Sequence, residues 1–391
     1  MVERPRKFVV LGGAGAIGRV VVRDLFESHR QNRILVADSN RTDAMAYASE
    51  FQSRRVRWQF ADCRQVEELS EVLKEHSVVI NCTHHRLNLG VMQASLNAGT
   101  HYMDLGGLFY WTRRQLKLDK EFEKAGLTAI LGMGCAPGIS NFMARQAVDM
   151  MDRVDSIKIR VGSRDLARQS ASFSFPYSAR TIIEELTMPP WAWIGGKFRQ
   201  TQPRASWERV DFGSPLGSLW TVRTRHSEVA TLPLMFAKKG LRFCDFKVSF
   251  DRHFVRELFK RRQAGWTIRQ FSKLAASRKH PRDYEIVQVV ATGREQGTQT
   301  SIEVTVECHS RARPGWAASA GDVDTACPAS IVAQMLANGS IKTHGVFPPE
   351  SILPLDPFIG KLKQRGIRWE LRVRRSHEVK GQQLWREKAG K

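Results

Sequence analysis

The segment that most constrains the fold is a glycine-rich turn near the N-terminus, Gly13-Ala14-Gly15-Ala16-Ile17-Gly18. It follows a short apolar run at residues 7–11, which is typical of a buried parallel strand. Residues 19–28 carry apolar side chains at three- to four-residue spacing, which predicts a helix. A second apolar run at residues 34–37 ends in Asp38. The order of strand, glycine turn, helix and strand predicts a βαβ unit.

The same alternation continues to residue 131. We expect strands at 56–60, 78–81, 101–104 and 127–131, with helices at 42–53, 65–74, 87–98 and 113–125. Strands that alternate with helices predict a parallel sheet with helices on both faces. Residues 1–140 are therefore expected to form an α/β domain with a doubly wound, Rossmann-type sheet.

The pattern changes beyond residue 150. Strands are expected at 154–162, 244–250, 284–294 and 300–310, and the last two flank a glycine-containing turn at 295–299. From 302 to 309 apolar residues alternate with Glu303, Thr305, Glu307 and His309, which predicts an antiparallel sheet with one face toward water. We expect an α+β substrate and dimerisation domain at 141–323, a further helix at 325–337, a C-terminal segment at 324–360 and a basic tail at 361–391.

Composition narrows the class of protein. A chain of 391 residues that is 42% hydrophobic can bury the cores of two or three domains. Its six cysteines show no C-x-x-C pair or zinc-ligand spacing, so we expect neither a disulfide scaffold nor a metal site. No apolar stretch approaches the ~20 residues of a membrane span. These features predict a soluble protein of the reducing cytoplasm.

The formal net charge is +22, and two segments contribute most of it. Residues 251–283 hold ten Lys and Arg against three acids, and residues 361–391 hold eleven against three. The first segment is expected to form amphipathic helices with Phe254 and Leu258 on one apolar side and Phe271, Leu274 and Ala275 on another. Solvated helix faces explain the charge most simply, but binding to nucleic acid or an anionic membrane stays open.

The glycine turn predicts a dinucleotide site. Gly13 permits the tight turn, Gly15 lets the backbone approach a pyrophosphate, and Gly18 allows close packing of helix and sheet. The N–H groups of the first helical turn, around Ala16 and Ile17, would bind the phosphates. Asp38 follows Gly18 by twenty residues at the end of the next strand, where it would bind the adenosine ribose and favour NAD. Ser39 would lie beside it, and the nearby Arg41 could instead accommodate NADP.

Two further segments end predicted strands at the same edge of the sheet. Asp62 would contact the adenine amine or cap the helix that follows. Asn81, Cys82 and Thr83 would line the floor near the nicotinamide ribose, because ligands of parallel sheets lie beyond the carboxyl ends of the strands.

The chain resembles the saccharopine dehydrogenase family, in its lysine 6-dehydrogenase and carboxynorspermidine synthase branch. The segments that carry the resemblance are Val9–Gly15, Ala98–Gly107, Gly134–Asn141, His226–Pro233 and Gly345–Glu350. The resemblance implies NAD(P)-linked chemistry at a C–N bond of an amino acid or amine, and a C-terminal segment that returns to the nucleotide domain.

Three functions remain open at this point. Oxidative deamination of a lysine-like diamino acid is the first expectation. NADPH-dependent reductive condensation of an amine with an aldehyde or keto acid is the second. The third is a non-catalytic dinucleotide-binding protein whose basic segments bind nucleic acid or membrane. We also expect a small amino-acid substrate and a homo-oligomer, such as a homodimer.

Chemistry at a C–N bond needs a group that exchanges protons near neutral pH, which suits a histidine. His226 is the first choice, with Glu228 two residues away as its partner or as a ligand for the substrate ammonium. Asp104 ends a predicted strand and could receive the amine or water. His84 and His85 are rivals for the proton transfer, whereas an ion pair or a cap would explain His226, Glu228 and Asp104 structurally.

A substrate carboxylate needs a cation, and the planar fork of arginine suits it best. Arg180, Arg223 and Arg225 are the candidates for this contact. Asn141 joins them as a substrate-binding candidate that could equally begin the helix into the second domain. Surface exposure is the alternative explanation for each arginine.

Overall fold

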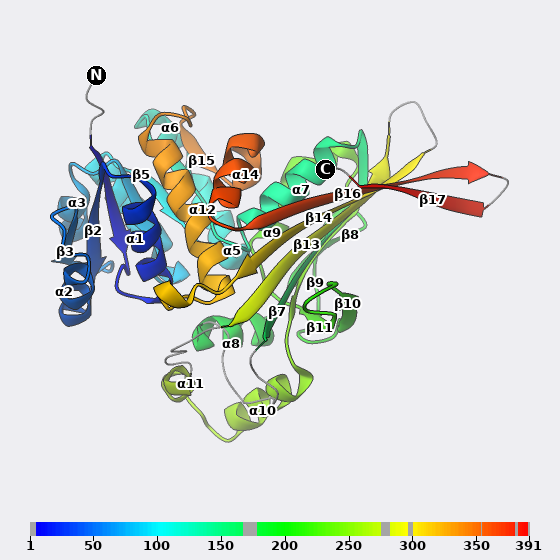
Figure 1. Cartoon of the computed structure of the whole chain (residues 1–391), viewed down its shortest axis with the longest axis horizontal. Helices are drawn as coiled ribbons and strands as arrows, with labels where there is room; N and C mark the ends of the chain where they lie inside the picture. The colour runs from blue at the N-terminus through cyan, green and yellow to red at the C-terminus, as the bar shows by residue number, and fades with distance from the viewer. Residues whose placement is uncertain are drawn as a thin grey trace. The chain divides into compact units, whose positions relative to one another are not determined.

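The computed structural model describes residues 5–166, 178–274, 282–295, 300–352, 354–379 and 382–389. The chain divides into two compact units, of which unit 1 comprises residues 1–142 and 322–366. Unit 2 comprises residues 143–321 and 367–391. Each unit is built around its own sheet, parallel in unit 1 and mainly antiparallel in unit 2 (Figure 1), which confirms the expected fold class.

The sheet of unit 1 is parallel throughout the described residues, in the order β15-β6-β5-β4-β1-β2-β3. The strands are β1 (Arg6–Leu11), β2 (Asn32–Asp38), β3 (Val56–Phe60), β4 (Val78–Asn81), β5 (His101–Asp104), β6 (Thr128–Ile130) and β15 (Gly345–Phe347). The six strands expected between residues 7 and 131 are confirmed. β15 comes from the far end of the chain and pairs with β6 at the edge of the sheet.

Helices connect these strands, as the alternation predicts. They are α1 (Ala16–Ser28), α2 (Arg41–Ser49), α3 (Val66–Leu73) and α4 (Asn88–Ala98). The single helix expected at 113–125 is wrong: the chain forms α5 (Leu108–Gln115), a 3-10 turn (Leu116–Leu118) and α6 (Asp119–Lys124). Phe109, Thr112 and Gln115 of α5 are buried. The helix begins at Leu108, five residues before the predicted start at residue 113.

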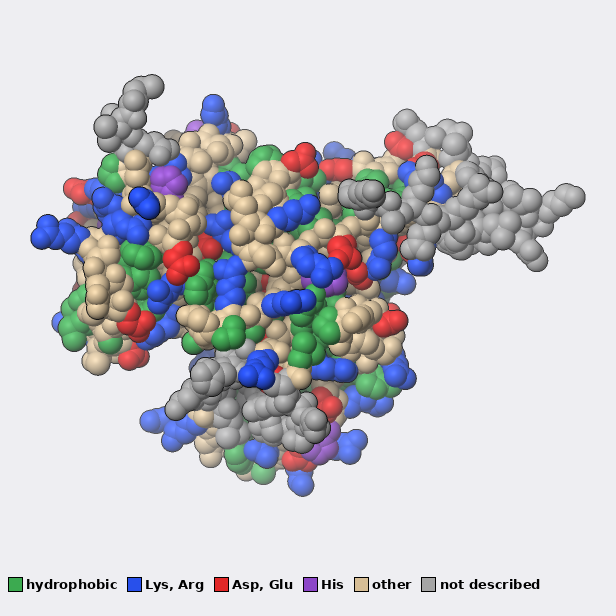
Figure 2. Space-filling model, viewed as in Figure 1, with side chains coloured by type: hydrophobic (Ala, Val, Ile, Leu, Met, Phe, Trp, Pro, Cys, Tyr) green, Lys and Arg blue, Asp and Glu red, His purple; other side chains and the backbone are tan. Residues whose placement is uncertain are grey.

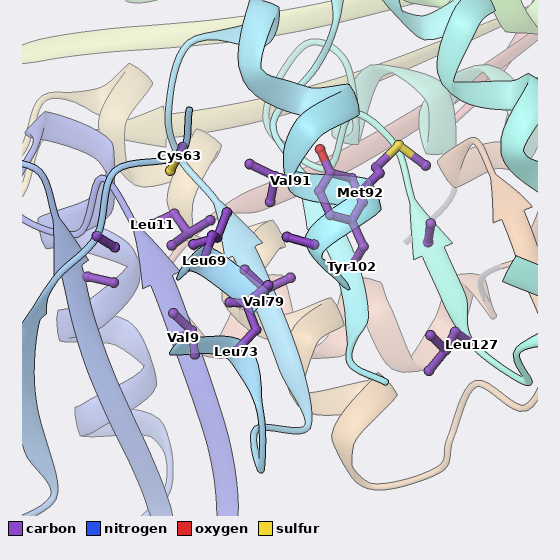
Figure 3. Packing of buried hydrophobic residues seen from close by; sticks show 14 of the residues in the cluster. Val9, Leu11, Cys63, Leu69, Leu73, Val79, Val91, Met92, Tyr102 and Leu127 are labelled. Atoms are coloured by element: carbon purple, nitrogen blue, oxygen red, sulfur yellow. The ribbon is translucent and has the colours of Figure 1, made fainter. Parts of the chain in front are cut away.

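The two faces of this sheet are covered by different helices. On one face the apolar side chains of α3 and α4 meet those of β1 and β4, and Figure 3 shows Leu73 beside Val9 and Val79 and Leu69 beside Leu11. On the other face lies α12 (Ala320–Ala337), whose Gln334 donates hydrogen bonds from Nε2 to the Ser28 Oγ at the end of α1, at 3.0 Å. α13 (Pro349–Ile352) and α14 (Leu355–Gln364) complete unit 1.

The sheet of unit 2 has the strand order β10-β11-β12-β7-β13-β14-β16-β17, with β8 and β9 attached beside β12. The strands expected from sequence are β7 (Arg153–Asp165), β12 (Phe243–Ser249), β13 (Asp283–Arg294) and β14 (Ser301–Arg311). The others are β8 (Trp191–Ile194), β9 (Lys197–Gln200), β10 (Glu208–Asp211), β11 (Ser218–Arg223), β16 (Arg368–Val379) and β17 (Gln382–Ala389). Residues 296–299 of the expected turn lie outside the described residues.

The polar face of β14 differs from the expectation in one respect. Glu303 and Thr305 are half-buried, but Glu307 and His309 are buried, with 4% and 7% of their surfaces exposed. Gln288 of β13 and Arg372 of β16 contact the Glu307 carboxylate, and the Tyr284 hydroxyl of β13 contacts His309. Long side chains of the two neighbouring strands therefore cover this part of the face.

Among the described residues, unit 2 also contains most of α7 (Ile139–Asp149) and the helices α8 (Ala179–Thr187), α9 (Glu228–Phe236), α10 (Arg252–Gln263) and α11 (Ile268–Leu274). α10 and α11 confirm the helices expected within 251–283, and Phe254, Leu258 and Phe271 are buried. The side chain of Leu274, and Ala275, lie outside the described residues. Among the described helices, none combines the length and the hydropathy needed to cross a bilayer.

Candidate functional site

The glycine turn of unit 1 joins β1 to α1 with no room for side chains at two positions. A Cβ on Gly13 would lie 2.8 Å from the Val10 carbonyl oxygen, and one on Gly18 only 2.1 Å from that of Gly12. The N-cap residue of α1 is Gly15, which has no side chain that could cap the helix. The N–H groups of the first turn, at the exposed Ala16 and half-buried Ile17, are therefore left for an anion. This cradle fits a pyrophosphate.

Asp38 lies at the carboxyl end of β2, and its carboxylate is fixed on the glycine turn. Its Oδ2 accepts a hydrogen bond from the Ala14 N–H at 3.1 Å, and its Oδ1 accepts one from the Asn40 N–H at 3.0 Å. Ser39 between them is exposed. The turn and the acid predicted to bind ribose thus form one rigid unit, although they are 24 residues apart.

Charged residues follow at the ends of β2 and β3. The exposed Arg41 places its guanidinium over the Phe60 ring, 4.5 Å from the ring centre. Asp62 forms a 2.6 Å ion pair with the exposed Arg64. The hydrogen bonds from Arg64 lower the pKa of Asp62 to about 2, so Asp62 is ionised and already paired where it was expected to contact adenine.

The Asn81-Cys82-Thr83 segment passes directly beside the glycine turn. Gly12 has a φ of +67°, and a Cβ there would lie 3.2 Å from the Cys82 carbonyl oxygen. Asn81 Oδ1 accepts hydrogen bonds from the Thr83 N–H at 3.1 Å and from the Thr83 hydroxyl at 2.5 Å. Burial raises the pKa of the Cys82 thiol to about 12, so it stays neutral. The structure brings this segment together with the glycine turn at one edge of the sheet.

Asp104 lies at the end of β5, and 1% of its surface is exposed. Its Oδ1 accepts hydrogen bonds from the backbone N–H groups of Gly106 at 2.8 Å and Gly132 at 2.7 Å. Its Oδ2 accepts from Tyr102 at 2.8 Å, Gln115 at 2.5 Å and Asn88 at 3.1 Å. Burial raises the pKa of Asp104, whereas the hydrogen bonds from Gln115, Gly132, Tyr102 and Gly106 act to lower it. Asp104 therefore holds together the loops that follow β5 and β6.

Asn141 is likewise buried, with 1% of its surface exposed. Its Oδ1 accepts a hydrogen bond from the Gly138 N–H at 3.0 Å, and its Nδ2 donates to Glu350 Oε2 at 2.8 Å. Gly138 has a φ of +126°, and a Cβ there would meet the Gly134 backbone. Asn141 thus fixes the turn that precedes α7 and attaches it to α13.

In unit 2, His226 lies between two carboxylates. Its Nδ1 is 2.7 Å from Glu228 Oε2, and its Nε2 is 3.7 Å from Glu185 Oε1. The imidazole stacks on the Phe246 ring, with 3.7 Å between ring centres. Burial acts to lower the pKa of His226, but the negative charge of Glu228, the hydrogen bond that the imidazole donates to it and the nearby Glu185 carboxylate raise this pKa to about 10. The rival histidines, His84 and His85, lie in unit 1 with their ring centres 4.0 Å apart and the rings tilted by 35°.

The three candidate arginines lie in different surroundings. Arg223 binds Asp245 Oδ2 through two nitrogens, at 2.8 Å and 3.2 Å. Arg225 is buried and donates to the Pro189 carbonyl oxygen at 2.9 Å and 3.1 Å. Arg180 is half-buried in the first turn of α8. Of the three, Arg223 belongs to a larger cluster of charges.

That cluster was missed by the sequence analysis. Arg160 on β7 binds Asp245 at 2.7 Å and Glu208 at 2.9 Å, and Lys247 binds Glu208 at 2.5 Å. With Arg223, three cations thus share two carboxylates on one face of the sheet. Two charged residues inside the otherwise apolar β12 were the available signal, because buried charges need partners.

Comparison with known proteins gives two matching family models. The model described as the saccharopine dehydrogenase NADP-binding domain matches residues 8–130. The model described as the saccharopine dehydrogenase C-terminal domain matches residues 134–367. Together they span nearly all of the chain.

Individual proteins of related name are similar to this chain at low sequence identity. Carboxyaminopropylagmatine dehydrogenase of Synechocystis sp. is 22% identical over 393 residues, covering 92% of this chain and 96% of the relative. Carboxynorspermidine synthase of Vibrio alginolyticus is 22% identical over 345 residues, covering 78% and 80%. The apo saccharopine dehydrogenase (L-Glu forming) of Saccharomyces cerevisiae has a TM-score of 0.73 at 16% identity, covering 94% of this chain and 99% of that one. This last likeness shows a shared fold.

Proposed function

Since this chain belongs to the saccharopine dehydrogenase family and is an oxidoreductase that acts on C–N bonds, we propose that it reduces an imine to a secondary amine. The imine would form from an amine and an aldehyde or keto acid. The names of two relatives support this direction, because carboxynorspermidine and carboxyaminopropylagmatine are both amines that carry a carboxyl group.

The observation that carries the proposal is the hydrogen bond between Ala14 and Asp38 at the uncapped start of α1. It places N–H donors for a pyrophosphate and a carboxylate for ribose hydroxyls on one turn, which is what a pyridine dinucleotide needs. When bound, the reduced dinucleotide supplies the hydride for the imine carbon. We propose NAD(H) over NADP(H), because the Asp38 carboxylate repels the additional phosphate.

His226 is proposed to donate the proton that the nitrogen gains. A histidine with a pKa raised to about 10 is protonated at neutral pH, and this favours an acid over a base. In the reduction, the amine and the carbonyl compound lose one water, the carbon gains the hydride, and the nitrogen gains the proton. Glu228 and Glu185 keep the imidazolium charged.

The charge cluster of unit 2 is proposed to hold the substrate carboxylate. Arg223, Arg160 and Lys247 outnumber the two carboxylates that they bind, so the cluster has a net charge of +1. A substrate carboxylate would restore neutrality. Asp104 and Asn141 have their polar atoms committed within unit 1, and we assign both to positioning loops.

A turnover assay tests the proposed function. The purified chain is given NADH or NADPH with an amino acid that carries an aldehyde, plus agmatine or a diamine, and oxidation of the dinucleotide is followed. We expect oxidation only when both organic substrates are present, and a secondary amine as the product by mass spectrometry. Reduction of NAD by a diamino acid, without coupling activity, would instead support oxidative deamination.

A further inference from the structure

Three side chains that can ligate a metal lie together on one face of the unit 2 sheet. Glu307 and Glu370 are directly opposite each other on the paired strands β14 and β16. His309 follows Glu307 by two residues, so its side chain lies on the same face of the sheet. One ligand atom of each residue lies within 4.8 Å of the others.

The imidazole of His309 has an unused nitrogen. Only 7% of the residue is exposed, and its Nε2 is buried without a hydrogen-bond partner among the described residues. The other nitrogen, Nδ1, lies 3.1 Å from the Tyr284 hydroxyl. When Nδ1–H donates to that hydroxyl, Nε2 carries the lone pair that a metal ion binds.

Each carboxylate turns one oxygen toward this nitrogen. The distances from His309 Nε2 are 3.7 Å to Glu307 Oε2 and 4.0 Å to Glu370 Oε2. Both exceed hydrogen-bond length but lie within ion-pair distance, so each carboxylate is close to the nitrogen without a hydrogen bond to it. Two ligand atoms that share one Zn²⁺ at about 2.1 Å lie about 3.4 Å apart in a tetrahedral site. To share an ion, the two distances from His309 Nε2 therefore need to shorten by about 0.3 Å and about 0.6 Å.

The remaining carboxylate oxygens are held from outside. Glu307 Oε1 accepts from Gln288 at 2.8 Å and pairs with Arg372 at 2.8 Å. Glu370 Oε1 pairs with Arg368. Outer contacts of this kind orient the carboxylates and the imidazole of metal sites.

We propose that Glu307, His309 and Glu370 form a binding site for a divalent transition-metal ion such as Zn²⁺. One imidazole and two carboxylates suit such an ion, with water completing the coordination. The two arginines offset the carboxylate charge, so we expect micromolar affinity. The ion links β14 to β16 and thereby fastens the last strands of the chain to the sheet. The site stands independently of the proposed imine reduction.

Calorimetric titration with Zn²⁺ tests the site on the full-length, untagged chain after treatment with a chelator. Glu370→Gln removes one ligand that is 39% exposed, so this variant should fold. Glu303→Gln is the matched control, because Glu303 lies on the same face of β14 and pairs with Arg374 at 3.7 Å. We expect a single strong site in the wild type and in Glu303→Gln. In Glu370→Gln the affinity should fall by more than the about 10- to 100-fold typical of losing an outer contact.

A second measurement tests whether His309 is a ligand of the ion. Co²⁺ bound in place of Zn²⁺ should give a visible spectrum with nitrogen and oxygen ligands, and His309→Gln should abolish it. Zn²⁺ should raise the Tm of the wild type and of Glu303→Gln, because a ligand that binds only the native state stabilises it. The proposal is overturned if the wild type binds no Zn²⁺ at micromolar concentration. It is also overturned if Glu370→Gln binds Zn²⁺ as tightly as the wild type, since the ion then binds elsewhere.

Discussion

At the scale of single residues, the dinucleotide site depends on one close approach of backbone to backbone. The Cα of Gly18 lies against the Gly12 carbonyl, where a Cβ would be only 2.1 Å from the oxygen. Because the obstacle is backbone, it cannot swing aside as a flexible side chain could. The sequence motif predicts this position, since the contact joins residues six apart in one turn.

Replacing Gly18 with Ala should therefore push α1 away from the turn. We expect dinucleotide affinity to fall by at least tenfold, and the Tm to fall because the clash costs about 1–3 kcal/mol. Gly90→Ala is the matched control, since a Cβ there meets its nearest atoms at 3.7 Å and 3.8 Å within α4. That change should stabilise the helix by about 0.5–1 kcal/mol. Equal dinucleotide affinities for the two variants would refute this account of the turn.

His226 gives a prediction about pH. Its pKa is about 10 in the folded chain against an ordinary value of 6.5, so the charged imidazole stabilises the fold. This stabilisation is fully present below pH 6.5 and is lost as the pH rises toward 10. The difference in Tm between the wild type and His226→Gln should therefore shrink over that range. A pH-independent difference for His226→Gln would contradict the paired imidazolium.

At the scale of elements, the strands with a clear hydrophobic pattern are the ones that the sequence predicts well. β1, β2 and β4 are apolar runs bounded by turn residues, and the sequence predicts them closely. β16 carries charged residues on both sides of its alternation, and the sequence analysis placed it in a basic tail. Such a strand is stabilised by its partner β14 more than by its own apolar residues. The sequence therefore did not bring Glu370 together with Glu307, because only the pairing of β14 with β16 places them opposite each other.

A substitution of Asp104 tests whether this side chain holds the loops that follow β5 and β6. Asp104→Asn keeps the shape but replaces one acceptor oxygen with a donor, which leaves buried N–H or O–H groups facing another donor. We expect a loss of at least about 2 kcal/mol in the free energy of unfolding, since each unsatisfied buried group costs about 1–3 kcal/mol. Asp155→Asn, which affects an exposed pair with Arg153, should change it by no more than about 0.5 kcal/mol. Urea unfolding measures both, and equal stability would show that Asp104 does not organise the loops.

At the scale of the whole molecule, the resemblance to the saccharopine dehydrogenase family is confirmed by models that match both halves of the chain. The glycine turn, Asp38 and the Asn81-Cys82-Thr83 segment could be predicted because they follow consecutive strands of one sheet. The charge cluster around Asp245 could not, because Arg160 on β7 meets Asp245 on β12 only through the pairing of two strands whose contacting residues are 85 positions apart.

The basic side chains of the described residues do not all gather over one element on the face drawn in Figure 2. Figure 2 shows Lys and Arg side chains scattered over this face with acidic side chains among them. Binding to nucleic acid or an anionic membrane remains a prediction, as do the homo-oligomer and the cytoplasmic location. Their test is separate from that of the enzyme, because salt-dependent binding to DNA or liposomes requires no dinucleotide.

The most direct test of the central claim is a calorimetric titration of the wild-type chain with NADH and with NADPH. The account predicts that one equivalent binds per chain, with NADH preferred because Asp38 repels the extra phosphate. It also predicts that Asp38→Ala lowers the affinity for NADH by about 10- to 100-fold, as expected for losing hydrogen bonds to a charged group. Absence of binding by either dinucleotide, or unchanged NADH affinity in Asp38→Ala, would contradict it.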